Sequence, residues 1–144
     1  MKPSPEILEL ISSAHTIAVV GLSSNPARPS YGVARYLQTQ GYRIIPVNPR
    51  EREVLGEAAV ASLDAIASEQ RPVDIVDVFR RSEFVPEIAE QAIRLGARLL
   101  WLQEGVRQEE AEAKARAAGL QVISDICLLK VHGRFIRPAG AAQL

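Results

Sequence analysis

Cysteine and histidine are scarce in this chain. Of its 144 residues, one is cysteine and two are histidine. A single thiol, Cys127, excludes an internal disulfide and is typical of a reducing compartment, so we expect a cytoplasmic protein. Cys127, His15 and His132 are also too few for a recognisable His/Cys metal site, so we expect no bound metal.

The chain also lacks net charge and long apolar runs. Its 17 basic and 17 acidic residues cancel, so no long-range field attracts a nucleic acid or a membrane surface, and we expect neither as a partner. No apolar run reaches the ~18 residues of a membrane span, and residues 1–5 contain no signal-peptide core. We expect one globular domain over residues 1–144, in which the stretch 125–144 is a partly irregular tail.

Apolar runs alternate with helical patterns along most of the chain. Predicted strands are Thr16–Val20, Arg43–Val47, Val73–Phe79, Ala97–Leu102 and Leu120–Ile123. Predicted helices are Pro5–Ser12, Tyr31–Gln40, Glu83–Leu95 and Glu109–Ala118, with a less regular stretch and a short helix near Leu63–Ala67. Three of these helices end in a glycine followed directly by an apolar run. The pattern predicts an α/β, Rossmann-like, doubly wound parallel sheet of about five strands in the order 3-2-1-4-5, with helices on both faces.

The loop after the first predicted strand has the features of a phosphate site. The strand ends at Gly21, a polar loop carries Arg28, and Ser30 is a plausible helix N-cap. The first turn of the following helix contains no acidic residue, which favours a bound anion over simple solvation of the helix end. The third and sixth positions from Gly21 are Ser23 and Pro26, so the dinucleotide glycine fingerprint is absent.

The next strand ends indicate which nucleotide is bound. An NAD site needs an acidic residue after the second strand, but this chain has Asn48 and Arg50 there. An arginine suits an extra phosphate, such as the 2′-phosphate of NADP or the 3′-phosphate of coenzyme A (CoA); a solvated surface arginine is the alternative. Arg80 and Arg81 follow the third strand, where phosphate contact and an ion pair with Asp74 or Asp77 are both open.

Six separated segments resemble those of the small prokaryotic CoA-binding proteins. They are Val19-Val20-Gly21-Leu22-Ser23, Arg28-Pro29-Ser30-Tyr31, Gly41-Tyr42, Pro46-Val47-Asn48-Pro49, Val78-Phe79-Arg80 and Trp101-Leu102-Gln103-Glu104-Gly105. This family in turn resembles the CoA-binding domain of the succinyl-CoA synthetase α subunit and of ADP-forming acyl-CoA synthetases. The resemblance extends from about Ile7 to Cys127, and it is specific because the segments occur in the same order.

The resemblance implies a site for CoA or an acyl-CoA at the carboxyl ends of the strands. By position, the implied ligand-binding residues are Gly21, Leu22, Ser23, Ser24, Arg28, Tyr31, Val47, Asn48, Pro49, Val78, Phe79, Arg80, Gln103 and Gly105. The first six would hold phosphates, the next three would flank the adenosine, and the rest would line a channel for adenine or the pantetheine arm. The family often has Met-Asp-Arg-Cys where this chain has Ser124-Asp125-Ile126-Cys127, so no role carries over for that arginine.

The sequence contains no recognisable catalytic constellation. His15 precedes the first strand, and His132 is interpreted as a surface residue of the tail. Cys127 has no activating partner and is interpreted as an inert buried thiol, while Glu104 is a lone carboxylate at the crevice. We therefore expect binding without catalysis: a carrier, a sensor, or a subunit that supplies the CoA site to a partner ligase. The alternatives are a small NADP-dependent oxidoreductase and an interaction module that has lost its ligand.

Overall fold

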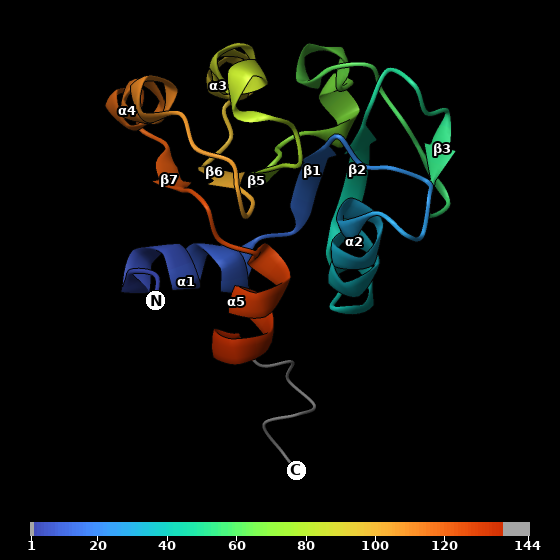
Figure 1. Ribbon diagram of the computed structural model, residues 1–144, viewed down its shortest axis with the longest axis horizontal. Coiled ribbons are helices and arrows are strands. Elements are labelled where there is room, and N and C mark those ends of the chain that lie inside the picture. The colour runs from blue at the N-terminus through green and yellow to red at the C-terminus, as the bar shows by residue number, and fades with distance from the viewer. Residues whose placement is uncertain (1, 137–144) are drawn as a thin grey trace.

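The computed structural model describes residues 2–136, which are built around a parallel five-stranded sheet (Figure 1). The strands of this sheet are β1 (Thr16–Val20), β2 (Arg43–Val47), β5 (Ile75–Val78), β6 (Leu99–Leu102) and β7 (Gln121–Ile123), and the two-stranded hairpin consists of β3 (Glu53–Val54) and β4 (Glu57–Ala58). The helices are α1 (Pro5–Ser13), α2 (Pro29–Thr39), α3 (Val85–Leu95), α4 (Glu109–Ala117) and α5 (Leu128–Phe135), with 3-10 turns at Leu63–Ala65, Ser68–Gln70 and Ser82–Phe84. The α/β class, the parallel five-stranded sheet and the helices on both faces confirm the prediction from sequence.

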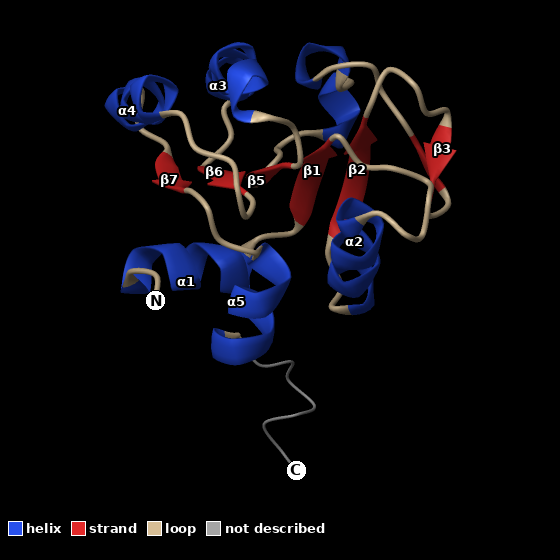
Figure 2. Ribbon diagram, viewed as in Figure 1, coloured by secondary structure: helices blue, strands red, loops and turns tan. Residues whose placement is uncertain are grey.

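Two layers of helices enclose the sheet (Figure 2). Helices α3 and α4 cover one face, and α1, α2 and α5 cover the other. Alternate residues of β1 divide between the two cores: Ala18 and Val20 pack under α3, and Ile17 and Val19 pack under α2 and α5. A strand buried on both faces must be apolar throughout, which is why the continuous apolar runs of the sequence predict these strands correctly.

The order of the strands differs from the prediction. The observed order is β2-β1-β5-β6-β7, so the third strand of the sheet pairs with the first and not with the second. Leu63 and Ile66, in the connection after β2, pack in the same core as α3, on the face opposite α2. A right-handed crossover on that face must run back across β1, which places β5 on the far side of it. The order in which successive strands are added to the sheet therefore reverses between β1 and β5. A doubly wound sheet binds its ligands at such a point.

Two segments contain structure that the sequence did not predict. The stretch after β2 holds the β3–β4 hairpin, whereas the short helix expected near Leu63–Ala67 is present as the 3-10 turn Leu63–Ala65. The expected irregular tail contains helix α5, which buries Leu128 and Val131 against the core under the sheet. The end of the tail, Pro138-Ala139-Gly140, lies outside the described residues.

Candidate functional site

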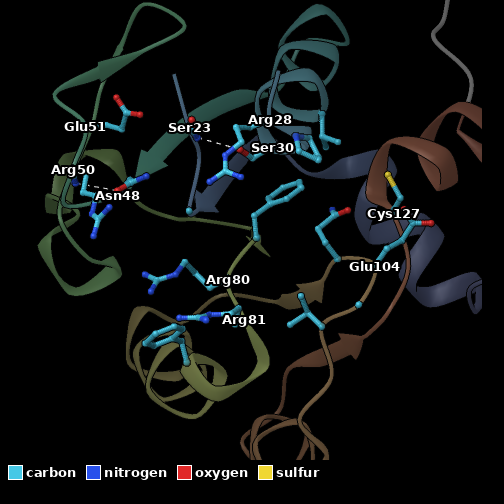
Figure 3. A pocket seen from close by; sticks show the side chains of 18 of the residues that line it. Ser23, Arg28, Ser30, Asn48, Arg50, Glu51, Arg80, Arg81, Glu104 and Cys127 are labelled. Carbon is cyan, nitrogen blue, oxygen red and sulfur yellow. Dashed lines mark hydrogen bonds between the residues drawn. The ribbon is translucent and has the colours of Figure 1, made fainter. Parts of the chain in front are cut away.

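A crevice of about 1040 Å³ opens at the carboxyl ends of four strands (Figure 3). Its walls come from the segments that follow β1, β2, β5 and β6. The lining residues are Gly21, Ser23, Arg28, Pro29, Ser30, Val33, Asn48, Pro49, Arg50, Glu51, Phe79, Arg80, Arg81, Phe84, Gln103, Glu104, Gly105, Val106 and Cys127. Neighbouring strands lie about 4.8 Å apart, so a ligand that reaches from the β2 end to the β6 end spans roughly 15 Å.

Gly21 lets the segments after β1 and β5 come together at the floor of the crevice. Its φ is +87°, and a Cβ at this position would lie 2.7 Å from the carbonyl oxygen of Phe79 and 3.1 Å from Cδ of Arg80. Its N–H donates to the carbonyl of Val47 at 2.8 Å, which ties the same point to β2. Any side chain here would meet both an unfavourable backbone conformation and a backbone clash.

Most backbone N–H groups of the loop after Gly21 donate hydrogen bonds to acceptors of the protein itself. Ser23 N–H donates to Oγ of Ser30 at 3.1 Å, and Ser24 N–H donates to a carboxylate oxygen of Glu51 at 2.8 Å. The N–H groups of Asn25, Ala27 and Arg28 bond within the loop. Most of these amides therefore hold the loop in shape and are not free to bind the phosphate that the sequence of the loop suggests.

Helix α2 points its positive end at the crevice. It begins with Pro29 after Arg28, its first turn contains no acidic residue, and no side chain caps it. Ser30 is not the N-cap that the sequence suggested: it lies inside the helix, and its hydroxyl accepts from the loop. Within residues 2–136 the N–H of Ser30 has no hydrogen-bond partner, so this helix end and the Arg28 side chain are the groups available to an anion.

Asn48 joins the loop after β2 to the loop after β1. Its amide nitrogen donates to the carbonyl of Leu22 at 3.0 Å, and its oxygen accepts from the N–H of Arg50 at 2.9 Å. Both the nitrogen and the oxygen of the amide are bonded within the protein, so Asn48 holds the two loops together and fixes the backbone of Arg50. Arg50 is exposed at this end of the crevice.

Arg80 and Arg81 form the basic wall after β5. The guanidinium of Arg80 lies 4.1 Å from the ring centroid of Phe84, a cation–π arrangement, and Arg81 lies 5.6 Å from the same centroid. Arg81 also makes a highly exposed ion pair with Glu83 at 3.8 Å. Neither pairs with an aspartate: Asp74 pairs with Arg98, and Asp77 bonds to Gln103. In the described part of the chain Arg28, Arg50 and Arg80 form no ion pair.

Asp77 is a buried carboxyl beside this crevice that sequence reasoning missed as a site residue. It lies on β5 between Val19 of β1 and Trp101 of β6, and it is fully buried. One carboxylate oxygen accepts from Nε2 of Gln103 at 2.6 Å, and the other has no hydrogen-bond partner. Burial raises the pKa of Asp77 to about 7, against the opposing effect of the Gln103 amide. An acidic residue inside an otherwise apolar buried strand was the signal for it in the sequence.

The β6 end of the crevice carries little free charge. Glu104 pairs with Lys130 at 3.0 Å, and Cys127 is buried, as the sequence interpretation expected. Gly105 has a φ of +84°, and its N–H donates to a carboxylate oxygen of Asp125 at 2.7 Å. Glu104 and Cys127 lie apart from the arginines of the other walls (Figure 3).

Nine of the fourteen site residues proposed from the sequence line the crevice: Gly21, Ser23, Arg28, Asn48, Pro49, Phe79, Arg80, Gln103 and Gly105. The other five do not. Leu22, Val47 and Val78 are buried in the two cores, Tyr31 of α2 packs against the core on its own face of the sheet, and Ser24 bonds to Glu51 through its backbone N–H. Residues such as Val33, Phe84 and Val106 join the lining because the fold turns them toward it.

His132 is not a surface residue. It is 3% exposed, and its Nδ1 lies 2.8 Å from the hydroxyl of Tyr36, with the ring of Tyr42 edge-on to it. Burial lowers its pKa. His132 lies at the interface of α5 with α2, and it does not line the crevice.

Comparison with known proteins identifies the family. The sequence profile of a family described as "CoA binding domain" matches residues 15–133, most of the chain. The chain belongs to this CoA-binding family. It is 45% identical to the uncharacterised protein YneT of Bacillus subtilis over 88% of this chain and 92% of YneT. A hypothetical protein from Pyrococcus horikoshii superposes with a TM-score of 0.87 and 34% identity, over 94% of each chain.

A ligase subunit is a more distant relative of this chain. The α subunit of an ADP-forming acetate–CoA ligase from Pyrococcus furiosus is 28% identical over 85% of this chain, but the match covers only 28% of that subunit. The membership supports CoA binding and a small-molecule ligand. Among residues 2–136 no helix is long and apolar enough to cross a membrane, and no group of three or more His, Cys, Asp or Glu residues is placed to hold a metal.

Proposed function

We propose that this chain binds CoA or an acyl-CoA in the crevice and performs no chemistry of its own. The observation that carries the proposal is the set of arginines Arg28, Arg50 and Arg80, which line one crevice from three different strand ends and form no ion pair in the part of the chain that is described. A guanidinium without a carboxylate partner is free to bind phosphate, and CoA carries three phosphate groups.

The orientation of the bound ligand follows from the distribution of charge along the crevice. The free arginines lie at the ends of β1, β2 and β5, whereas the β6 end offers Gln103, Val106 and Cys127. The phosphates and adenosine therefore belong to the β2–β1–β5 side, and the uncharged pantetheine arm belongs to the β6 side.

The groups at the β6 end of the crevice argue against a catalytic role. Glu104 is already paired with Lys130, and Cys127 is buried beside no histidine of the crevice lining. A carboxylate held by a lysine is a weak general base, and a thiol without an activating base is a poor nucleophile. The role that fits is a carrier or sensor of acyl-CoA, or a subunit that supplies the CoA site to a separate ligase.

Titration calorimetry with CoA, acetyl-CoA, NAD and NADP tests this function. We expect both CoA ligands to bind and both nicotinamide ligands to bind far more weakly, because Asn48 and not an acidic residue directly follows β2, and Glu51, the next acidic residue, already accepts from the N–H of Ser24. Tight binding of NADP without a CoA signal would overturn the proposal in favour of an oxidoreductase.

A further inference from the structure

Gln103 lines the crevice with an amide that is held at one end. Its Nε2 donates to the carboxylate of Asp77 at 2.6 Å, and among the described residues its Oε1 has no hydrogen-bond partner. In its ionised form, which prevails above pH ~7, Asp77 only accepts hydrogen bonds, so it selects the orientation of the amide in which nitrogen faces Asp77. The carbonyl oxygen on the other arm of the amide then has no partner in the described protein and is left for the crevice that Gln103 lines.

We propose that Asp77 is a positioning residue that fixes Gln103 as a hydrogen-bond acceptor for the pantetheine arm of the bound ligand. The inference rests on the proposed binding of CoA and extends it to the part of the ligand that Gln103 recognises. The arm offers donors of two kinds, its amide N–H groups and the terminal thiol, and either one complements a fixed carbonyl oxygen.

The surroundings of Asp77 support a positioning role. Its neighbours in the sheet are Val19 and Trp101, and its second oxygen is buried without a partner. The titratable groups of the nearby crevice walls are Arg80, Glu104 and Cys127, and none of them contributes to the pKa of Asp77. A carboxyl placed this way in the sheet has Gln103 as its only polar contact in the described structure, so its effect on a ligand passes through that amide.

The test compares ligands with and without the arm. Titration calorimetry at pH ~8, where Asp77 is ionised, with CoA and with 3′-phosphoadenosine 5′-diphosphate, which has the head of CoA but no pantetheine, separates the two ends of the crevice. Gln103→Met removes the acceptor at similar length, and we expect it to weaken CoA about fivefold, the effect of one hydrogen bond, while the affinity for the arm-free ligand is unchanged.

The swapped pair Asp77→Asn with Gln103→Glu is the matched variant. Its asparagine amide would donate to the introduced glutamate, whose second oxygen would still face the crevice, with the same total charge and nearly the same volume. We expect CoA affinity within about twofold of the wild type, because the acceptor is retained. Acetyl-CoA identifies the donor: it lacks the thiol hydrogen, so its affinity responds to Gln103→Met only if an amide N–H is the donor.

Several outcomes would overturn the inference. Equal loss for CoA and the arm-free ligand would mean a structural role, and no loss for CoA would mean no contact. If the swapped pair binds CoA as weakly as Gln103→Met does, Gln103 acts as a donor and the assignment is wrong. The swapped pair also decides the matter if Gln103→Met fails to fold. Failure of the wild type to bind CoA at all would instead overturn the proposed function and this inference with it.

Discussion

Replacement of Asp77 by asparagine should change how the stability of the protein depends on pH. The Asp77 carboxyl is fully buried on β5, and burial raises its pKa to about 7. An unfolded chain has an aspartate pKa of about 3.9, so the native state holds this proton more tightly. Ionisation of Asp77 therefore opposes folding: its contribution to stability is greatest below pH ~4 and falls as the pH rises toward 7.

The size of the effect follows from the two pKa values. A difference of about three between the unfolded and native pKa corresponds to about 4 kcal/mol of unfolding free energy. Asparagine has nearly the shape of the protonated aspartate and does not ionise. The unfolding free energy of Asp77→Asn minus that of the wild type should therefore rise by about 1.4 kcal/mol per pH unit between pH ~4 and ~7, then level off near ~4 kcal/mol above its acid value.

Urea denaturation at fixed pH values from about 5 to 9 measures this difference, in which the other titrating groups cancel. Asp64→Asn is the control: Asp64 is exposed, and its hydrogen bond to Arg94 lowers its pKa, so the carboxyl is ionised in both states throughout this range and the stability difference between that variant and the wild type should stay constant. A difference between Asp77→Asn and the wild type that stays constant over this pH range would refute the reasoning, because it would mean that Asp77 ionises alike in both states.

Three further predictions concern the crevice and the helix below it. Arg28→Glu should weaken CoA by at least ~1.5 kcal/mol in calorimetry, whereas Arg43→Glu, the same change at the exposed start of β2, should leave the affinity unaltered; equal effects would mean general charge repulsion. Gly21→Ala should lower the unfolding free energy by at least ~1 kcal/mol, because φ is +87° and Phe79 blocks the Cβ; Gly41→Ala, with a similar φ but open space, should cost less in the same denaturation assay. Burial lowers the pKa of His132, so the stability it gives as a neutral ring is present above pH ~6.5 and lost as the pH falls below; thermal melts of His132→Gln should lack that acid loss, and a parallel fall in both proteins would argue against it.

The elements of the fold could be predicted from local patterns in the sequence. Each strand of the sheet is covered by helices on both faces, so it must be a nearly continuous apolar run, and such runs are visible without a structure. Gly41 and Gly96 follow α2 and α3 with φ of +98° and +79°, which is the left-handed conformation that their position after a helix suggested. Helix α5 was not predicted, because its 8 residues form too short a pattern to identify a helix, and only packing under the sheet shows that His132 is buried.

The position of the crevice could also be predicted, but its chemistry could not. Parallel strands end at one edge of a sheet, so Gly21, Asn48, Phe79 and Gln103 had to lie near one another once the strands were assigned. Which of these groups are free for a ligand depends on contacts between segments far apart in the chain. Asn48 is occupied by Leu22 and Arg50, and Ser24 by Glu51, whereas the arginines are left without ion-pair partners within residues 2–136.

The sequence by itself determined the class of the fold, the edge of the sheet at which the crevice lies and the segments that form its walls, because hydrophobic periodicity and chain direction are local properties. The tertiary structure alone decided the strand order, through the face that Leu63 and Ile66 cover, and with it the point between β1 and β5 where the crevice opens. It also decided the pairing of Asp77 with Gln103. A buried carboxyl acquires its ionisation and its partner from the atoms that surround it, and those are set only when β1, β5 and β6 lie side by side.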